Sequence, residues 1–242
     1  MAPDGRDVQS VTAVYERLRE AIVTGEIPGG AVSSQLALSR DLEAGRTPLR
    51  EALRLLQNEG LVVGEPNRRV RVAELTGPDL QELYTLRILL ETAAVRLTIP
   101  NLDSSDIAEM RGYMAQMDHY GGDRDWAGLR GPHKAFHRKL VEAGGPRTVK
   151  LIEDLFDQAE RYRLAHIAAT TEQWAERQVE HQDLIDVAVE RNVEETAKVL
   201  TRHYIRTATL VLANLEPDRQ FELLEASVES VALAPGKSYR PR

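Results

Sequence analysis

The N-terminal part of the chain carries apolar residues at the spacing of a helix. Within residues 11–30, six apolar side chains fall on one helical face: Val11, Val14, Tyr15, Leu18, Ile22 and Val23. A glycine at position 25 and a Pro-Gly-Gly sequence at 28–30 follow, and such residues end helices. We therefore predict a first helix that ends near Gly25.

Two shorter helices are predicted after this break. The first covers residues 34–42, SQLALSRDL. The second runs to Asn58, with Thr47 expected as its N-cap, Pro48 at its first helical position and Gly60 closing it. Its apolar positions are expected in the core: Leu49, Ala52, Leu53 and Leu56.

A β-hairpin is predicted next. Short β-rich runs at 61–63 and 70–73 flank the turn sequence Gly-Glu-Pro-Asn-Arg. A helix, a helix-turn-helix and a hairpin, in this order, outline a winged helix-turn-helix, which is a DNA-binding fold.

From Thr76 onward the pattern is almost entirely helical. A broad apolar stripe follows Gly77 and ends at Pro100, and a second helix begins near Ser104 and stops at Gly121. Further helices are predicted at 125–143, 148–169, 171–190 and 194–215.

These elements predict a mainly α chain with two domains. A winged helix-turn-helix domain with a small β-hairpin wing is expected over 8–75, and an all-α antiparallel bundle of six to seven helices over 76–232. The tail, 233–242, is expected to be disordered.

The composition narrows the chemistry that is available. The 242 residues include no cysteine, which excludes disulfides, thiolate nucleophiles and cysteine zinc sites and favours a cytoplasmic location. There is no run of about 18 apolar residues and no secretion signal, so no membrane association is expected.

The charge is unevenly distributed along the chain. Residues 1–72 hold ten Arg, no Lys and ten acidic residues, so the net charge of −7 lies entirely in the remainder. Seven Arg fall within residues 40–71. Arginine is the side chain best suited to phosphates and guanine edges, although a solvated surface would also account for this pattern.

The stretch GRTPLREALRLLQNEGLV resembles the recognition-helix signature of the GntR family of bacterial transcription regulators. Three later stretches resemble the FCD-type ligand-sensing domain of the FadR subfamily: LQELYTLRILLE, HKAFHRKLVEAGG and EHQDLIDVAVERNVEETAKVLTRH. The likeness covers roughly residues 11 to 215. It implies an effector-responsive DNA-binding regulator.

Five residues are predicted to contact DNA. The Thr47 hydroxyl and the helix N-terminus suit a phosphate, and Arg46 and Arg50 suit a phosphate or a guanine edge. The wing residues Arg68 and Arg69 suit the minor groove or the DNA backbone.

Two positions depart from the family pattern. Glu43 stands where a turn glycine is usual, and Arg69 stands where the wing tip commonly has glycine. A β-carbon at a left-handed turn position costs about 1 kcal/mol.

His133 and His137 are four residues apart and would lie on one helical face. They could form half of a metal site, or they could be two unrelated side chains. The subfamily commonly binds a divalent metal through one Asp and three His. By this resemblance, the metal-ligand positions in this sequence are His133, His137, His181 and His203, and His133 stands where the family has its Asp.

Four imidazoles would suit a divalent transition metal, with Zn or Ni favoured and Mg or Ca disfavoured. The resemblance also makes Arg87 the candidate to bind an anionic effector. A surface position for His133 remains the alternative, and the remaining histidines, His119 and His166, are expected on the surface.

An enzyme is a competing interpretation that we do not favour. His133 and His137 have the spacing of zinc-protease ligands, but Lys134 stands where the general-base Glu belongs. No nucleophile elbow, phosphate loop or dinucleotide glycine pattern occurs in the sequence. A helical interaction module with a degenerate DNA reader is a further alternative.

The sequence therefore predicts a homodimeric transcription regulator, a repressor by resemblance. It is expected to bind a palindromic double-stranded DNA operator and to respond to a small carboxylate. Effector binding would shift the population of states that fit both half-sites.

Overall fold

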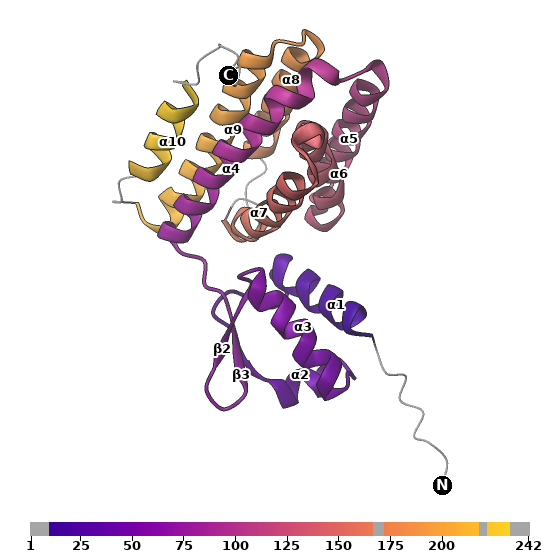
Figure 1. Cartoon of the computed structure of the whole chain (residues 1–242), viewed down its shortest axis with the longest axis vertical. Helices are drawn as coiled ribbons and strands as arrows, with labels where there is room; N and C mark the ends of the chain where they lie inside the picture. The colour runs from indigo at the N-terminus through magenta and orange to yellow at the C-terminus, as the bar shows by residue number, and fades with distance from the viewer. Residues whose placement is uncertain (1–9, 167–171, 218–221, 233–242) are drawn as a thin grey trace, which may run out of the picture. The chain divides into compact units, whose positions relative to one another are not determined.

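The computed structural model describes residues 10–166, 172–217 and 222–232 of the chain (Figure 1). Contacts divide it into two compact units, Met1–Leu75 and Thr76–Arg242. The predicted mainly α fold with a small sheet is confirmed.

The first unit is a winged helix-turn-helix. Its elements are α1 (Val11–Val23), β1 (Val32–Ser34), α2 (Gln35–Asp41), α3 (Arg46–Asn58), β2 (Val62–Glu65) and β3 (Arg69–Val72). The three strands form an antiparallel sheet in the order β1-β3-β2. The hairpin was predicted, whereas β1 was not, because its three residues carry no alternating pattern of their own.

The core of this unit lies between α1, α2, α3 and the sheet. The four predicted core positions of α3 are all buried: Leu49, Ala52, Leu53 and Leu56. They pack with apolar side chains of α1, including Val14 and Leu18. Removing this apolar surface from water is the main stabilisation of such a small unit.

The predicted N-cap role of Thr47 is wrong. Helix α3 begins at Arg46, and the extended residue Gly45 is its N-cap, with no capping bond from a side chain. Thr47 and Pro48 therefore lie inside the first turn. Proline is tolerated there because the first N–H groups of a helix have no intrahelical partner.

Of the two positions predicted to depart from glycine, only Glu43 has a left-handed backbone. Glu43 has a φ of 54°, so a non-glycine residue does occupy the left-handed turn position. At the wing, the left-handed residues are Asn67 and Arg68, with φ values of 60° and 56°. Arg69 is not among the left-handed residues, because it lies in β3, paired with Ser34 and Glu65.

The second unit is the predicted helical bundle. Its α-helices are α4 (Gly77–Thr98), α5 (Ser104–Gly122), α6 (Trp126–Lys139), α7 (Pro146–His166), α8 (Glu172–Val189), α9 (Val193–Leu215) and α10 (Glu222–Ala232). A short 3₁₀ turn, η1 (Ile99–Asn101), lies between α4 and α5, and a second, η2 (Glu142–Gly144), lies between α6 and α7. Helix α4 lies alongside α9 and α10 (Figure 1). No separate helix was predicted from the sequence at the position of α10.

The start of α4 is fixed by a residue of α7 and by the C-cap residue of α9. The Thr76 side chain caps the helix by accepting a bond from the Asp79 N–H. The Thr76 N–H donates to the Tyr162 hydroxyl of α7, and the Gly77 N–H donates to a carboxylate oxygen of Glu216, each at 3.1 Å. The helix that directly follows the first unit in the chain is thus anchored in the bundle.

Some predictions fall outside the described residues. These are the tail, 233–242, and the segment at 167–171, where two predicted helices were expected to end and begin. No helix of the described residues is long and apolar enough to cross a membrane.

Candidate functional site

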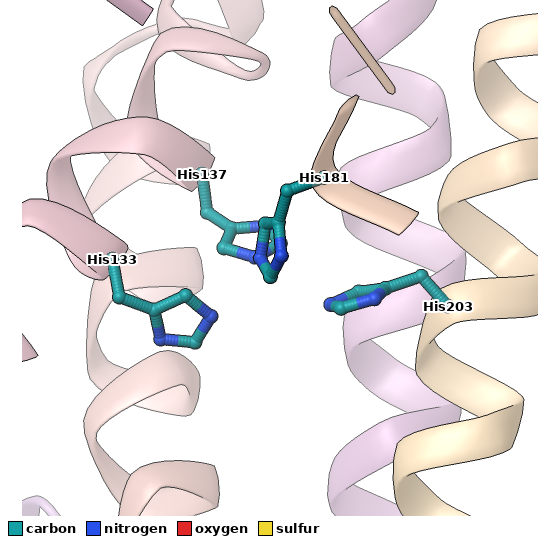
Figure 2. Close-up of side chains that lie close together, drawn as sticks. All are labelled: His133, His137, His181 and His203. Atoms are coloured by element: carbon teal, nitrogen blue, oxygen red, sulfur yellow. The ribbon is translucent and has the colours of Figure 1, made fainter. Parts of the chain in front are cut away.

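The bundle brings the four predicted histidines together. His133 and His137 come from α6, His181 from α8 and His203 from α9. All four are buried, and one ring nitrogen of each lies within 4.8 Å of the others. Figure 2 shows the pair from α6 facing the other two rings. The alternative of a surface position for His133 is therefore wrong.

Outer hydrogen bonds determine which nitrogen faces the centre in three of the four rings. Nδ1 of His181 lies 2.7 Å from the carbonyl oxygen of Arg177, and Nδ1 of His203 lies 2.8 Å from a carboxylate oxygen of Glu180. Both acceptors require a proton on Nδ1, and a neutral ring with its proton there has a free lone pair on Nε2.

His137 is oriented by a tyrosine. Its Nδ1 lies 3.1 Å from the Tyr204 hydroxyl, which donates its own proton to Glu91 and so accepts from the histidine. Burial raises the pKa of Tyr204 well above its usual value of 10, so the hydroxyl keeps its proton. Nε2 of His137 then lies 3.3 Å from Nε2 of His181, and both lone pairs are available to one cation.

His133 differs from the other three. Its Nδ1 lies 3.7 Å from a carboxylate oxygen of Glu160, which is longer than a hydrogen bond. Glu160 is buried on α7 and accepts a 2.8 Å bond from Nε of Arg163. A negative charge is therefore present beside His133, although the histidine stands where the family has its Asp.

Burial keeps three of the four histidines neutral, namely His133, His137 and His181. It lowers the pKa of His133 to about 4, and it lowers the pKa values of His137 and His181 well below 6.5. The other histidines of the cluster lower these values further, because nearby imidazolium charges repel each other. Neutral imidazole is the form that ligates a metal, so these three rings do not have to lose a proton before they bind one.

The space between the rings is small. The cavity has a volume of about 20 Å³, and its lining includes all four histidines. A volume of this order holds a water molecule or an ion but no metabolite. The donor set and the cavity together fit a single transition-metal cation.

Three buried arginines line the same cavity: Arg87, Arg163 and Arg177. Arg87 donates from Nε to Glu91 and from Nη2 to the Tyr204 hydroxyl, both at 2.8 Å. The predicted effector residue thus lies beside the histidines, but with existing partners. The sequence did not single out Arg163 or Arg177, because a charged residue within a helix is usually on the surface.

Lys134 has a structural partner. Its Nζ lies 2.5 Å from a carboxylate oxygen of the buried Asp157. The position that carries the general base in zinc proteases is therefore held by a cation in an ion pair. Nothing in this arrangement supports hydrolysis.

A second candidate site lies on the winged unit. One surface groove is lined by Ser34, Gln35, Leu36, Arg46, Leu49, Arg50, Asn67 and Arg68. It unites three of the predicted DNA contacts, Arg46, Arg50 and Arg68, whereas Thr47 and Arg69 are outside its lining. Among the described residues, no acidic side chain lines it, and Glu43 lies outside its lining.

The groove's arginines are available to a ligand. Arg50 lies 3.7 Å from Glu51, but the two side chains are 68% and 43% exposed, and an exposed pair of this kind is weak. Gln35 and Leu36 were missed by sequence reasoning. They enter the groove because α2 begins beside the wing tip, where the Gln35 N–H donates to the Arg68 carbonyl at 3.0 Å.

A winged reader with an arginine-lined groove, joined to a helical unit with a buried cluster of histidines, defines a class of DNA-binding regulators. The comparison with protein families agrees. Residues 11–72 match the model of bacterial regulatory proteins of the gntR family, and residues 82–206 match the FCD domain. The chain belongs to the GntR family of transcription regulators and carries an FCD domain.

Individual relatives span most of the chain. It is 27% identical to the HTH-type transcriptional regulator YdhC of Bacillus subtilis, over 78% of this chain and 85% of that protein. It is also 27% identical to the Nta operon transcriptional regulator of Aminobacter aminovorans, over 84% of this chain and 90% of that protein. The structure of E. coli McbR/YncC shares the fold, with a TM-score of 0.76 at 20% identity, covering 86% of this chain and 99% of that one.

The role of Glu180 in orienting His203 is testable. Removing an outer carboxylate from a metal-ligating histidine typically weakens metal affinity about 10- to 100-fold. We expect Glu180→Ala to lose zinc affinity by about this factor, measured by competition with a chromophoric chelator. Asp183→Ala, which removes an exposed carboxylate that lines the same surface pocket as Glu180 and His203, is the matched control. Equal affinities in the two variants would show that Glu180 does not support the site.

Proposed function

We propose that the protein is a homodimeric repressor of the FadR subfamily that binds a palindromic operator and responds to a small carboxylate. The observation that carries the DNA-binding part is the arginine-lined groove of the winged unit. The observation that carries the sensing part is the cluster of four buried imidazoles.

In the proposed complex, helix α3 reads the major groove of DNA. Arg46 and Arg50, the first and fifth residues of the helix, contact guanine edges or phosphates, and the Thr47 hydroxyl contacts a phosphate. Arg68 and Arg69 hold the DNA backbone or enter the minor groove. One reader offers few base contacts, so a dimer on a two-fold symmetric site supplies the specificity.

In the proposed sensing site, His133, His137, His181 and His203 hold a zinc or nickel ion. When bound, the ion supplies a Lewis-acidic positive charge that attracts an anion. Glu160 and Glu180 lie next to the ligands and offset part of this charge. Mg and Ca prefer oxygen ligands and are not proposed.

The effector is proposed to act through Arg87. The cavity of about 20 Å³ has no room for a carboxylate metabolite, so binding requires side chains to move. A carboxylate that takes the Arg87 guanidinium competes with Glu91 on the same helix and with Tyr204 on α9. This exchange alters the packing of α4, and the population of states that fit both half-sites shifts with it.

The DNA-binding proposal predicts a specific loss in one variant. Arg50→Ala is expected to weaken operator binding by about 1 to 3 kcal/mol if the side chain reads a base. Binding to operator and to random duplex DNA is compared by fluorescence anisotropy at one salt concentration. Arg54→Ala, an exposed arginine of α3 outside the groove, is the matched control. Equal losses on both DNAs would make Arg50 a phosphate contact.

The effector proposal predicts a separable defect. Arg87→Lys keeps the charge beside the buried Glu91 but removes the planar fork that binds a carboxylate through two bonds. We expect operator affinity to be unchanged while the response to a panel of mono-, di- and tricarboxylates is lost. Arg96→Lys, on the same helix, is the control and should respond as the wild type. A wild-type response from Arg87→Lys would remove Arg87 from the effector site.

A further inference from the structure

Leu36 is an exposed apolar side chain in a groove that three arginines also line. It is the second residue of α2, and its surface is 58% exposed. The other leucine of the groove, Leu49, is buried in the core. Single exposed leucines are common on proteins, so exposure alone carries no argument. What distinguishes Leu36 is that it shares its groove with three arginines.

The backbone around Leu36 is held in place. Ser34 caps α2 by accepting a 3.1 Å bond from the Ala37 N–H, and it pairs with Arg69 across the sheet. The Gln35 N–H donates to the Arg68 carbonyl at 3.0 Å. These bonds fix the start of α2 against the wing tip, so Leu36 keeps its place relative to Arg68.

The chemistry of DNA matches this combination of side chains. Arginines suit phosphates and guanine edges, whereas the apolar group that the major groove presents is the C5-methyl of thymine. An amide side chain such as that of Gln35 suits the N6 and N7 atoms of adenine. Adjacent residues at the start of a helix can therefore meet the two bases of an A·T pair, or of neighbouring pairs.

We infer that Leu36 is a specificity-determining residue that contacts a thymine methyl group in the operator, with Gln35 beside it on adenine. The inference rests on the proposed DNA-binding function and deepens it, because it assigns a base-pair preference to α2 in addition to α3. The groove is then a composite reading face: arginines bind phosphate and guanine, and the start of α2 recognises an A·T pair.

The test isolates a single methyl group. The full-length protein first selects its operator from a random duplex library, and each thymine of the selected site is then replaced by deoxyuridine. For the wild type, we expect one position in each half-site at which loss of the methyl group weakens binding about fourfold, the factor for one buried methylene-sized group. Leu36→Ala should bind the thymine and uracil operators equally.

A matched control separates this contact from a general loss of apolar surface. Leu55 is an exposed leucine of the same unit that lies outside the groove, and Leu55→Ala should keep the wild-type sensitivity to uracil. If no uracil replacement weakens wild-type binding, or if Leu36→Ala keeps the sensitivity, the inference is wrong. If no sequence is enriched from the library at all, the proposed DNA-binding function itself fails.

Discussion

The histidine cluster depends on the need to satisfy the ring N–H groups of buried imidazoles. A buried ring N–H without an acceptor is costly, and here Tyr204, Glu180 and the Arg177 carbonyl accept from three of the rings. These acceptors lie on α8 and α9, so the requirement joins those helices to α6. The same bonds leave the Nε2 atoms facing one another, and the geometry of a metal site follows from the hydrogen bonds around it.

Tyr204 extends this network to the helix that follows the DNA reader. Its hydroxyl contacts His137, Glu91 and Arg87, so α6, α9 and α4 meet at one oxygen atom. Helix α4 follows the winged unit directly in the chain, and its first turn is held by hydrogen bonds to Tyr162 and Glu216. Under the proposed mechanism, an anion that competes for Arg87 acts on the helix to which the reader is attached.

The sequence predicted those features that local patterns determine. Amphipathic spacing located α1 and α3, and the family resemblance selected the histidines that the fold brings together. Tertiary contacts determine the rest: Tyr204 and Glu91 are 113 residues apart, and no local pattern marks Glu160 or Glu180 as neighbours of histidines. The first turn of α3 was misassigned because Pro48 is tolerated at several positions there. Similarly, residues of α2 line the arginine groove because α2 contacts the wing. The spacing of residues in the sequence does not reveal this contact.

The metal content of the chain tests the central claim most directly. Protein purified without an affinity tag or a chelator is analysed for its elements, as the wild type and as His137→Ala, with the exposed His119→Ala as a control. The account predicts about one transition-metal ion per chain in the wild type and in His119→Ala, and its loss in His137→Ala. Wild-type protein that holds no metal, even after incubation with zinc and nickel salts, would contradict it.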